Sequence, residues 1–259
     1  MKSKAKPRVA VLCGEGLNTD REMQYAFELA GAGADWVHVL DLLSGEVNLR
    51  GYQIFVIPGG FLNGDDIASA KVFATQLQHK MEDQLLEFVQ SDKLVLGICN
   101  GFQTLVKSGL LPYGDFKQKL TLTYNGSGRF EDRWVYLEVD KDSPCVFTRG
   151  IERLYLPVRH GEGKFYAPDD VLDALEESNQ VVVRNVGRNG EMDPPYPENP
   201  NGSLRAIAGI CDPSGRIYAM MPHPEAYVHR LQHPRWTREQ LPEEGGGLKI
   251  FRNAVDYFK

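Results

Sequence analysis

The residue best suited to nucleophilic chemistry is Cys99, in the segment Gly97-Ile98-Cys99-Asn100-Gly101. An apolar run over 94–96 precedes it and a helical pattern follows, which is the layout of a nucleophile elbow with Cys in place of Ser. Because a tight strand-to-helix turn leaves little room two residues on either side of the nucleophile, glycine suits positions 97 and 101. The turn would also put Cys99 at a helix N-terminus, whose dipole favours the thiolate. Taken alone, this segment fits a buried structural cysteine at a strand end equally well.

A general base and the group that orients it can come from the segment Pro222-His223-Pro224-Glu225. In an extended segment held by two prolines, residues two apart point the same way, so His223 and Glu225 can meet. The carboxylate would then fix the tautomer of the imidazole and stabilise the imidazolium. A histidine and an acid on a polar loop is the simpler interpretation of this segment alone. Combined with the cysteine elbow, however, it favours a Cys–His–Glu triad that folding brings together.

A third segment offers backbone donors for a developing negative charge. The apolar run 54–57 ends in Pro58-Gly59-Gly60, which leaves N–H groups bare at the carboxyl edge of a parallel sheet, where open α/β folds bind ligands. The N–H of Gly60, together with that of Asn100, would form an oxyanion hole. An ordinary glycine turn explains this segment as well when it is considered in isolation.

The elements that must position these motifs alternate in the first half of the chain. Strands are predicted at 8–12, 36–42, 53–57 and 94–96. Between and after them, helices are predicted from a capping box at Thr19-Asp20-Arg21-Glu22 to Gly31, over 71–90, and from residue 102 onward. This alternation indicates a parallel sheet with helices on both faces.

After about residue 110 the pattern changes to strands joined without long helices. The final helix is predicted over 248–258, after strands at 119–124, 134–139, 153–159, 181–186, 206–211 and 216–221. The last two strands flank Asp212-Pro213-Ser214-Gly215, a hairpin turn signal. The expected fold class is therefore α/β, with a central, mostly parallel sheet flanked by helices and with additional antiparallel strands. No internal repeat or linker is evident, so we expect one domain over residues 1–259.

Composition narrows the class of protein further. A net charge of −6 argues against binding to nucleic acid through charge. The apolar runs are too short for a membrane span or a secretory signal, and four scattered cysteines suit a reducing cytosol, so we expect a cytoplasmic protein without membrane contact. His229 and His233 have no third ligand nearby, so no metal site is expected.

In their order along the chain, the three motifs resemble the class I (triad) glutamine amidotransferases. Further segments narrow the resemblance to the glutaminase subunits of phosphoribosylformylglycinamidine synthase, an enzyme of de novo purine synthesis. These segments are Gly16 to Glu22, Asn100-Gly101-Phe102-Gln103, His160-Gly161-Glu162-Gly163 and Asn199-Pro200-Asn201-Gly202-Ser203. The resemblance covers nearly the whole chain and implies the flavodoxin-like amidotransferase fold.

The resemblance also implies a mechanism. Cys99 would attack the side-chain amide carbon of L-glutamine, and His223, oriented by Glu225, would protonate the departing ammonia and then activate water against the thioester. Gly60 and Asn100 would donate to the oxyanion, and Gln103 would contact the bound glutamine.

The implied partners are a large synthetase subunit, which receives the ammonia and acts on formylglycinamide ribonucleotide, and a small accessory subunit. No cofactor is expected in this chain, since ATP and magnesium would be used by the synthetase subunit.

Other functions remain open at this point. A triad glutaminase could serve a different synthetase, for GMP, CTP or carbamoyl phosphate. A cysteine hydrolase or chaperone of the related superfamily shares the elbow, but its typical members would lack the Pro222-His223-Pro224-Glu225 ending. A glutamine-binding or regulatory module without turnover is the non-enzymatic alternative.

Overall fold

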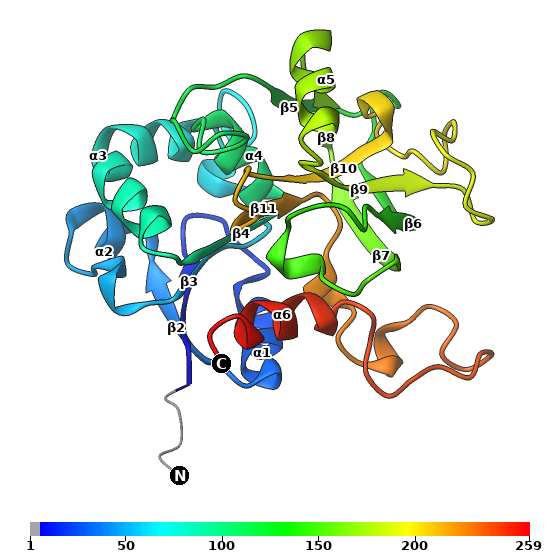
Figure 1. Ribbon diagram of the computed structural model, residues 1–259, viewed down its shortest axis with the longest axis horizontal. Helices are drawn as coiled ribbons and strands as arrows, with labels where there is room; N and C mark the ends of the chain where they lie inside the picture. Colours follow the sequence, from blue (N-terminus) through cyan, green and yellow to red (C-terminus); the bar gives the residue numbers. More distant parts are fainter. Residues whose placement is uncertain (1–5) are drawn as a thin grey trace.

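A computed structural model describes residues 6–259 as a nine-stranded sheet covered by helices (Figure 1). The strands are β1 Arg8–Cys13, β2 Gly33–His38, β3 Ile54–Ile57, β4 Leu94–Ile98, β5 Thr121–Tyr124, β6 Glu131–Val139, β7 Arg153–His160, β8 Glu162–Tyr166, β9 Val181–Val186, β10 Ile207–Cys211 and β11 Ile217–Met220. The helices are α1 Asp20–Ala30, α2 Val39–Ser44, α3 Lys71–Gln90, α4 Asn100–Lys107, α5 Asp169–Glu177 and α6 Leu248–Asp256.

The large sheet is parallel in one half and antiparallel in the other. Its strand order is β2-β1-β3-β4-β11-β10-β9-β6-β7, with parallel pairing from β2 to β11 and antiparallel pairing from β11 to β7. Strands β5 and β8 form a separate antiparallel pair. The expected class, an α/β fold with a parallel sheet and additional antiparallel strands, is confirmed.

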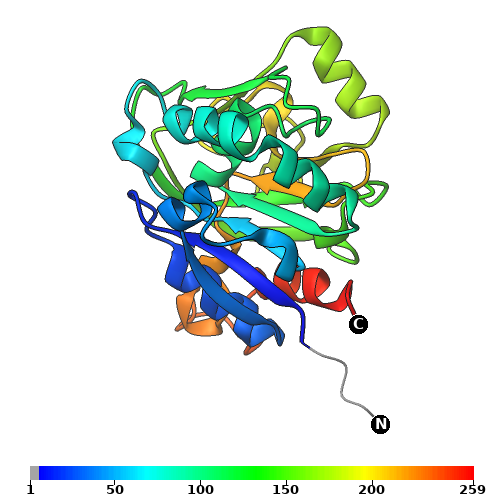
Figure 2. The same ribbon diagram turned by 90° about the vertical axis from the view of Figure 1, so that its left-hand side faces the viewer.

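Helices cover both faces of the parallel half. Turning the molecule shows α3 and α4 on one side of the sheet and α1 and α6 on the other (Figure 2). On the latter side the rings of Phe27 and Phe251 meet edge to face at 5.0 Å. Because both faces are covered, every residue of β3 and β4 is buried, which explains why these strands read as continuous apolar runs.

Two local predictions were wrong. The strand expected over 36–42 ends at His38, where the imidazole accepts a hydrogen bond from the Leu40 N–H and so caps helix α2. The capping box expected at Thr19 does not form either, although α1 begins at Asp20, because the Thr19 hydroxyl bonds a distant loop instead. Helix α5, nine residues long, lies in the half where strands joined without long helices were expected before the final helix.

The predicted hairpin around Asp212 is confirmed, since β10 and β11 pair antiparallel across it. The Asp212 carboxylate accepts hydrogen bonds from the N–H groups of Ser214, Arg216 and Ile217. This turn sends β11 back beside β4, in parallel register from Ile217 opposite Val95 to Met220 opposite Ile98. The segments that follow these two strands, with Cys99 and His223, therefore leave the same edge of the sheet.

Candidate active site

Cys99 lies at the turn between β4 and α4, with φ 52° and ψ −102°. A positive φ costs energy for any residue other than glycine, and such strain is concentrated at functional sites. Glycine is needed beside it, since a Cβ at Gly101 would lie 1.9 Å from the Ile57 carbonyl oxygen. The buried Cys99 Sγ is 3.7 Å from the Arg159 carbonyl oxygen, toward which the thiol donates. Strand, strained turn and helix follow one another as the elbow motif predicts.

His223 follows β11 and forms a buried pair with Glu225. Its Nδ1 is 2.6 Å from Glu225 Oε1, and both side chains are almost completely inaccessible to solvent. Because a carboxylate only accepts hydrogen bonds, Nδ1 carries a proton, and Nε2 is the nitrogen that can give or take a proton during a reaction. His223 Nε2 makes no hydrogen bond within residues 6–259.

The charges around His223 favour its protonated form. Burial lowers its pKa, but the charges of Glu225 and Cys99 outweigh burial and raise the pKa to about 9. An imidazolium beside a cysteine is the arrangement that activates cysteine nucleophiles. The sequence-predicted triad is therefore assembled in space.

The loop after β3 is held against the segment that precedes α1. Gly60 has φ +154°, and a Cβ there would lie 2.6 Å from the Leu17 Cα. The Thr19 hydroxyl accepts a hydrogen bond from the Gly59 N–H at 2.9 Å. Within the described part of the chain, the N–H groups of Gly60 and Asn100 have no acceptor. Both remain available to a ligand, as an oxyanion hole requires.

A small cavity of about 130 Å³ joins these groups. It is lined by Asn18, Thr19, Gly60, Phe61, Cys99, Phe130, Arg159 and His223. The nucleophile, the histidine and one predicted oxyanion donor therefore face one space. Thr19, Phe130 and Arg159 had no sequence signal for this position, because long-range folding brings them to the cavity.

Gln103, which the resemblance places in contact with glutamine, does not line this cavity. Its buried side-chain amide is used internally, since Oε1 accepts from Asn100 Nδ2 at 2.8 Å and Nε2 donates to the Glu162 carbonyl oxygen. The Asn100 side chain also accepts from the Leu62 N–H at 3.1 Å and donates to Asp65 at 3.1 Å. Gln103 thus braces Asn100, and its contact with substrate stays a prediction.

His160 is a second buried histidine near His223. The Asn125 Nδ2 donates to two carbonyl oxygens, and its Oδ1 accepts from the Gly163 N–H. The same Oδ1 lies 3.1 Å from His160 Nδ1, and because Oδ1 can only accept, His160 Nδ1 carries the proton. This leaves His160 Nε2 unprotonated and without a partner in residues 6–259. Burial, with a smaller effect of the His223 charge, lowers the pKa of His160 to about 3, so it stays neutral.

A buried ion pair ties the loop after β3 to the nucleophile helix. Lys107 Nζ, near the end of α4, donates to the Ser69 carbonyl oxygen at 2.6 Å and lies 3.7 Å from Glu162 Oε2. Glu162 in turn accepts from the Ser69 N–H at 3.3 Å. Burial lowers the pKa of Lys107, but the Glu162 charge opposes that effect.

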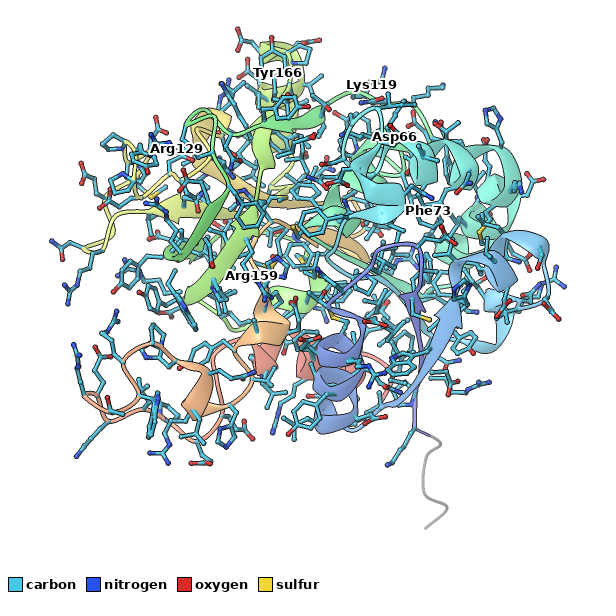
Figure 3. The ribbon with its side chains drawn as sticks, turned by 180° about the vertical axis from the view of Figure 1, so that it is seen from behind. Asp66, Phe73, Lys119, Arg129, Arg159 and Tyr166 are labelled. Atoms are coloured by element: carbon cyan, nitrogen blue, oxygen red, sulfur yellow. The ribbon has the colours of Figure 1, made fainter. Side chains whose placement is uncertain are left out.

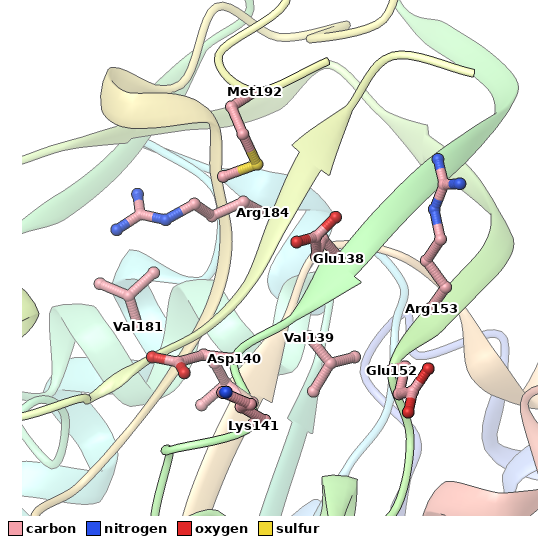
Figure 4. A pocket seen from close by; sticks show the side chains of 10 residues that line it. Glu138, Val139, Asp140, Lys141, Glu152, Arg153, Val181, Arg184 and Met192 are labelled. Carbon is pink, nitrogen blue, oxygen red and sulfur yellow. The ribbon is translucent and has the colours of Figure 1, made fainter. Parts of the chain in front are cut away.

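A larger cavity of about 540 Å³ lies between strands β6, β7 and β9 and contains none of the predicted site residues (Figure 4). Two cations on its walls are already engaged, Arg184 by Glu176 at 2.6 Å and Arg153 by the Gly187 carbonyl oxygen at 3.1 Å. No group of three or more His, Cys, Asp or Glu side chains within residues 6–259 is arranged to hold a metal ion. Among the helices within residues 6–259, none combines the length and the apolar composition of a membrane span.

Comparison with known proteins agrees with this geometry. Residues 6–258 match the family model of the CobB/CobQ-like glutamine amidotransferase domain. The chain is 50% identical over 255 residues to the phosphoribosylformylglycinamidine synthase subunit PurQ of Dehalococcoides mccartyi, covering 98% of both chains. The PurQ subunit of Methanococcus maripaludis is 40% identical over 269 residues, again with 98% of both chains covered.

Among solved structures, a chain of the PurLQS structure from Thermotoga maritima matches with a TM-score of 0.74 and 31% identity, covering 98% of this chain and all of that one. A putative GMP synthase subunit from Thermoplasma acidophilum, at 14% identity and a TM-score of 0.57, shares the fold alone. This chain belongs to the glutamine amidotransferase family, as a glutaminase subunit of phosphoribosylformylglycinamidine synthase.

Proposed function

We propose that Cys99, His223 and Glu225 hydrolyse L-glutamine to glutamate and ammonia. The single observation that carries this assignment is that His223, held by the buried Glu225 at 2.6 Å, lines the same small cavity as the strained Cys99. The family of the chain supports the same reaction.

In the first half of the reaction, the Cys99 thiolate attacks the amide carbon of glutamine and the carbonyl oxygen becomes an oxyanion. The free N–H groups of Gly60 and Asn100 stabilise that charge. His223 Nε2 then gives its proton to the leaving nitrogen, so that ammonia departs and a thioester remains. The pKa of His223, at about 9, keeps this proton in place at neutral pH.

In the second half, the neutral His223 takes a proton from water, which attacks the thioester carbon. The tetrahedral intermediate collapses with release of glutamate, and Cys99 and the imidazolium are restored. Glu225 holds Nδ1–H throughout, so that Nε2 is the only nitrogen that exchanges a proton.

The ammonia passes to a large synthetase subunit that uses ATP and magnesium to convert formylglycinamide ribonucleotide to formylglycinamidine ribonucleotide. The relatives are named as subunits of this synthase, and one is a chain of a PurLQS structure, which supports such an assembly. A small accessory subunit completes the proposed complex, and this chain itself needs no cofactor. We propose that all its residues, 1–259, act as one amidotransferase domain in the cytoplasm.

The test is release of glutamate from glutamine, with and without the synthetase subunit, for wild type, Cys99→Ala and Cys13→Ala. Cys13 is a matched control, since it is a free cysteine outside the cavity. We expect release that requires Cys99, that Cys13→Ala leaves unchanged and that rises when the synthetase subunit is added. Full activity in Cys99→Ala would refute the triad, and indifference to the synthetase subunit would refute the partner.

A further inference from the structure

The walls of the cavity at Cys99 carry a net positive charge, since two cations outnumber the Cys99 thiolate. Among its lining residues, all within the described part of the chain, Arg159 has the only permanent cation, and His223 adds an imidazolium because its pKa is about 9. No carboxylate side chain lines the cavity, since Glu225 lies buried on the far side of His223. Such a cavity favours a ligand with a negative group.

Arg159 has hydrogen-bond donors that the protein does not use. Its Nη2 is buried without a hydrogen-bond partner in residues 6–259, and the nearest carboxylate oxygen, Glu225 Oε1, is 3.9 Å away. In contrast, Arg184 and Arg205 make close ion pairs at 2.6 Å. A guanidinium carries five N–H donors, and a buried donor without an acceptor costs free energy until a ligand supplies one.

The position of Arg159 relates it directly to the nucleophile. Its carbonyl oxygen faces Cys99 Sγ at 3.7 Å, while its side chain, 38% exposed, lines the cavity. Figure 3 labels Arg159 near the middle of the face seen from behind. A ligand whose reacting carbon lies at Cys99 therefore has this guanidinium on the wall of the same cavity.

We propose that Arg159 binds the α-carboxylate of glutamine and thereby selects the free amino acid over glutamine whose carboxyl group is blocked. This inference rests on the proposed glutaminase reaction. A cavity of about 130 Å³ suits one amino acid, and its amide end must reach Cys99. The planar fork of a guanidinium matches a carboxylate through two parallel hydrogen bonds, which an ammonium group cannot reproduce.

The variants Arg159→Met and Arg159→Lys test the assignment through steady-state kinetics with glutamine and with its α-carboxamide. Loss of a charge-assisted hydrogen bond corresponds to a rise in KM for glutamine of about 10- to 100-fold, with kcat changed little. Wild type should prefer glutamine over the carboxamide, and Arg159→Met should lose most of that preference. Arg129→Met is the control, since Arg129 is exposed and does not line the cavity.

A second readout does not depend on turnover. Cys99 would be alkylated by iodoacetamide and, separately, by a chloromethyl ketone shaped like glutamine with a free α-carboxylate. Arg159→Met should slow labelling by the ketone about tenfold or more and leave labelling by iodoacetamide unchanged, which also reports an intact site.

Each outcome decides between the two proposals. If wild type with its synthetase subunit releases no glutamate, the proposed function fails. If wild type is active while Arg159→Met keeps both its KM and its preference for glutamine, only the role of Arg159 is overturned. A change in kcat and its pH profile with the preference intact would mean that Arg159 acts through Glu225 instead, which also overturns the proposal.

Discussion

Replacing Glu225 by Gln tests how the triad holds its proton. The substitution keeps the size of the side chain but removes the charge 2.6 Å from His223 Nδ1. Burial alone lowers the pKa of His223, and the Glu225 charge is the largest influence in the opposite direction. In Glu225→Gln the pKa of His223 should therefore fall well below about 9.

The size of the effect follows from that pKa. The rise from 6.5 to about 9, to which both Glu225 and Cys99 contribute, corresponds to ~3 kcal/mol of net stabilisation of the imidazolium, at about 1.36 kcal/mol per pKa unit, and Glu225 supplies the largest favourable share. If the transition state loses this stabilisation, kcat for glutamine falls about 100-fold. KM should change much less, since Glu225 does not line the cavity.

Two measurements check this expectation. An NMR titration of the His223 ring gives its pKa in wild type and variant, and glutamate release gives kcat. Glu243→Gln is the matched control, because Glu243 also contacts a histidine, His229, at 2.8 Å but is mostly exposed. A Glu225→Gln variant with an unchanged titration midpoint and kcat would refute the reasoning.

Three other predictions concern the loop beside the cavity and the two buried histidines. Gly60→Ala should lower kcat about 100-fold, as a lost oxyanion donor does, because the new Cβ would meet main-chain atoms of a neighbouring loop within 3 Å; an unchanged kcat contradicts this. Thr19→Val should lower kcat about fivefold, since the Gly59 N–H loses a hydrogen bond of about 1 kcal/mol, whereas Thr19→Ser should retain activity. The stability contributed by the raised pKa of His223 is present below pH 6.5 and is lost as the pH rises through about 9. The stability contributed by the lowered pKa of His160 is present above pH 6.5 and is lost as the pH falls toward about 3. Urea unfolding across this range should therefore show the greatest stability from these two histidines near pH 6.5, and His160→Gln should flatten only the acid side.

The parts of the site that could be predicted from sequence are those whose chemistry depends on local conformation. Gly97 and Gly101 are required by the tight turn on either side of Cys99. The pairing of His223 with Glu225 was predicted correctly, but the extended segment expected there is wrong, since Pro224–Ala226 form a single 3-10 turn that begins at His223. Buried central strands are likewise visible as apolar runs, because both of their faces are covered.

The parts that were missed depend on contacts between distant residues. Thr19 has the sequence of a helix cap, yet its hydroxyl bonds Gly59, forty residues away, because that backbone competes for the same oxygen. Arg159 lies on an ordinary strand and acquires a role only through the cavity it lines. The helix α2 after His38 was missed because a short apolar run has no periodicity to separate a helix from a strand.

Asn100 explains how two distant elements can form one oxyanion hole. Its N–H remains free beside Cys99, while its side chain is bonded to the loop after Gly60 through Leu62 and Asp65. At the other end of α4, Lys107 and Glu162 hold the same loop at Ser69, so the helix and the loop are joined at two places. Hydrogen-bond donors that are held in place before reaction need no reorganisation when charge develops, which is the condition for strong electrostatic stabilisation. The buried Lys107–Glu162 pair is therefore best understood as a means of holding the two donors at a constant separation, since a buried ion pair by itself adds little to stability.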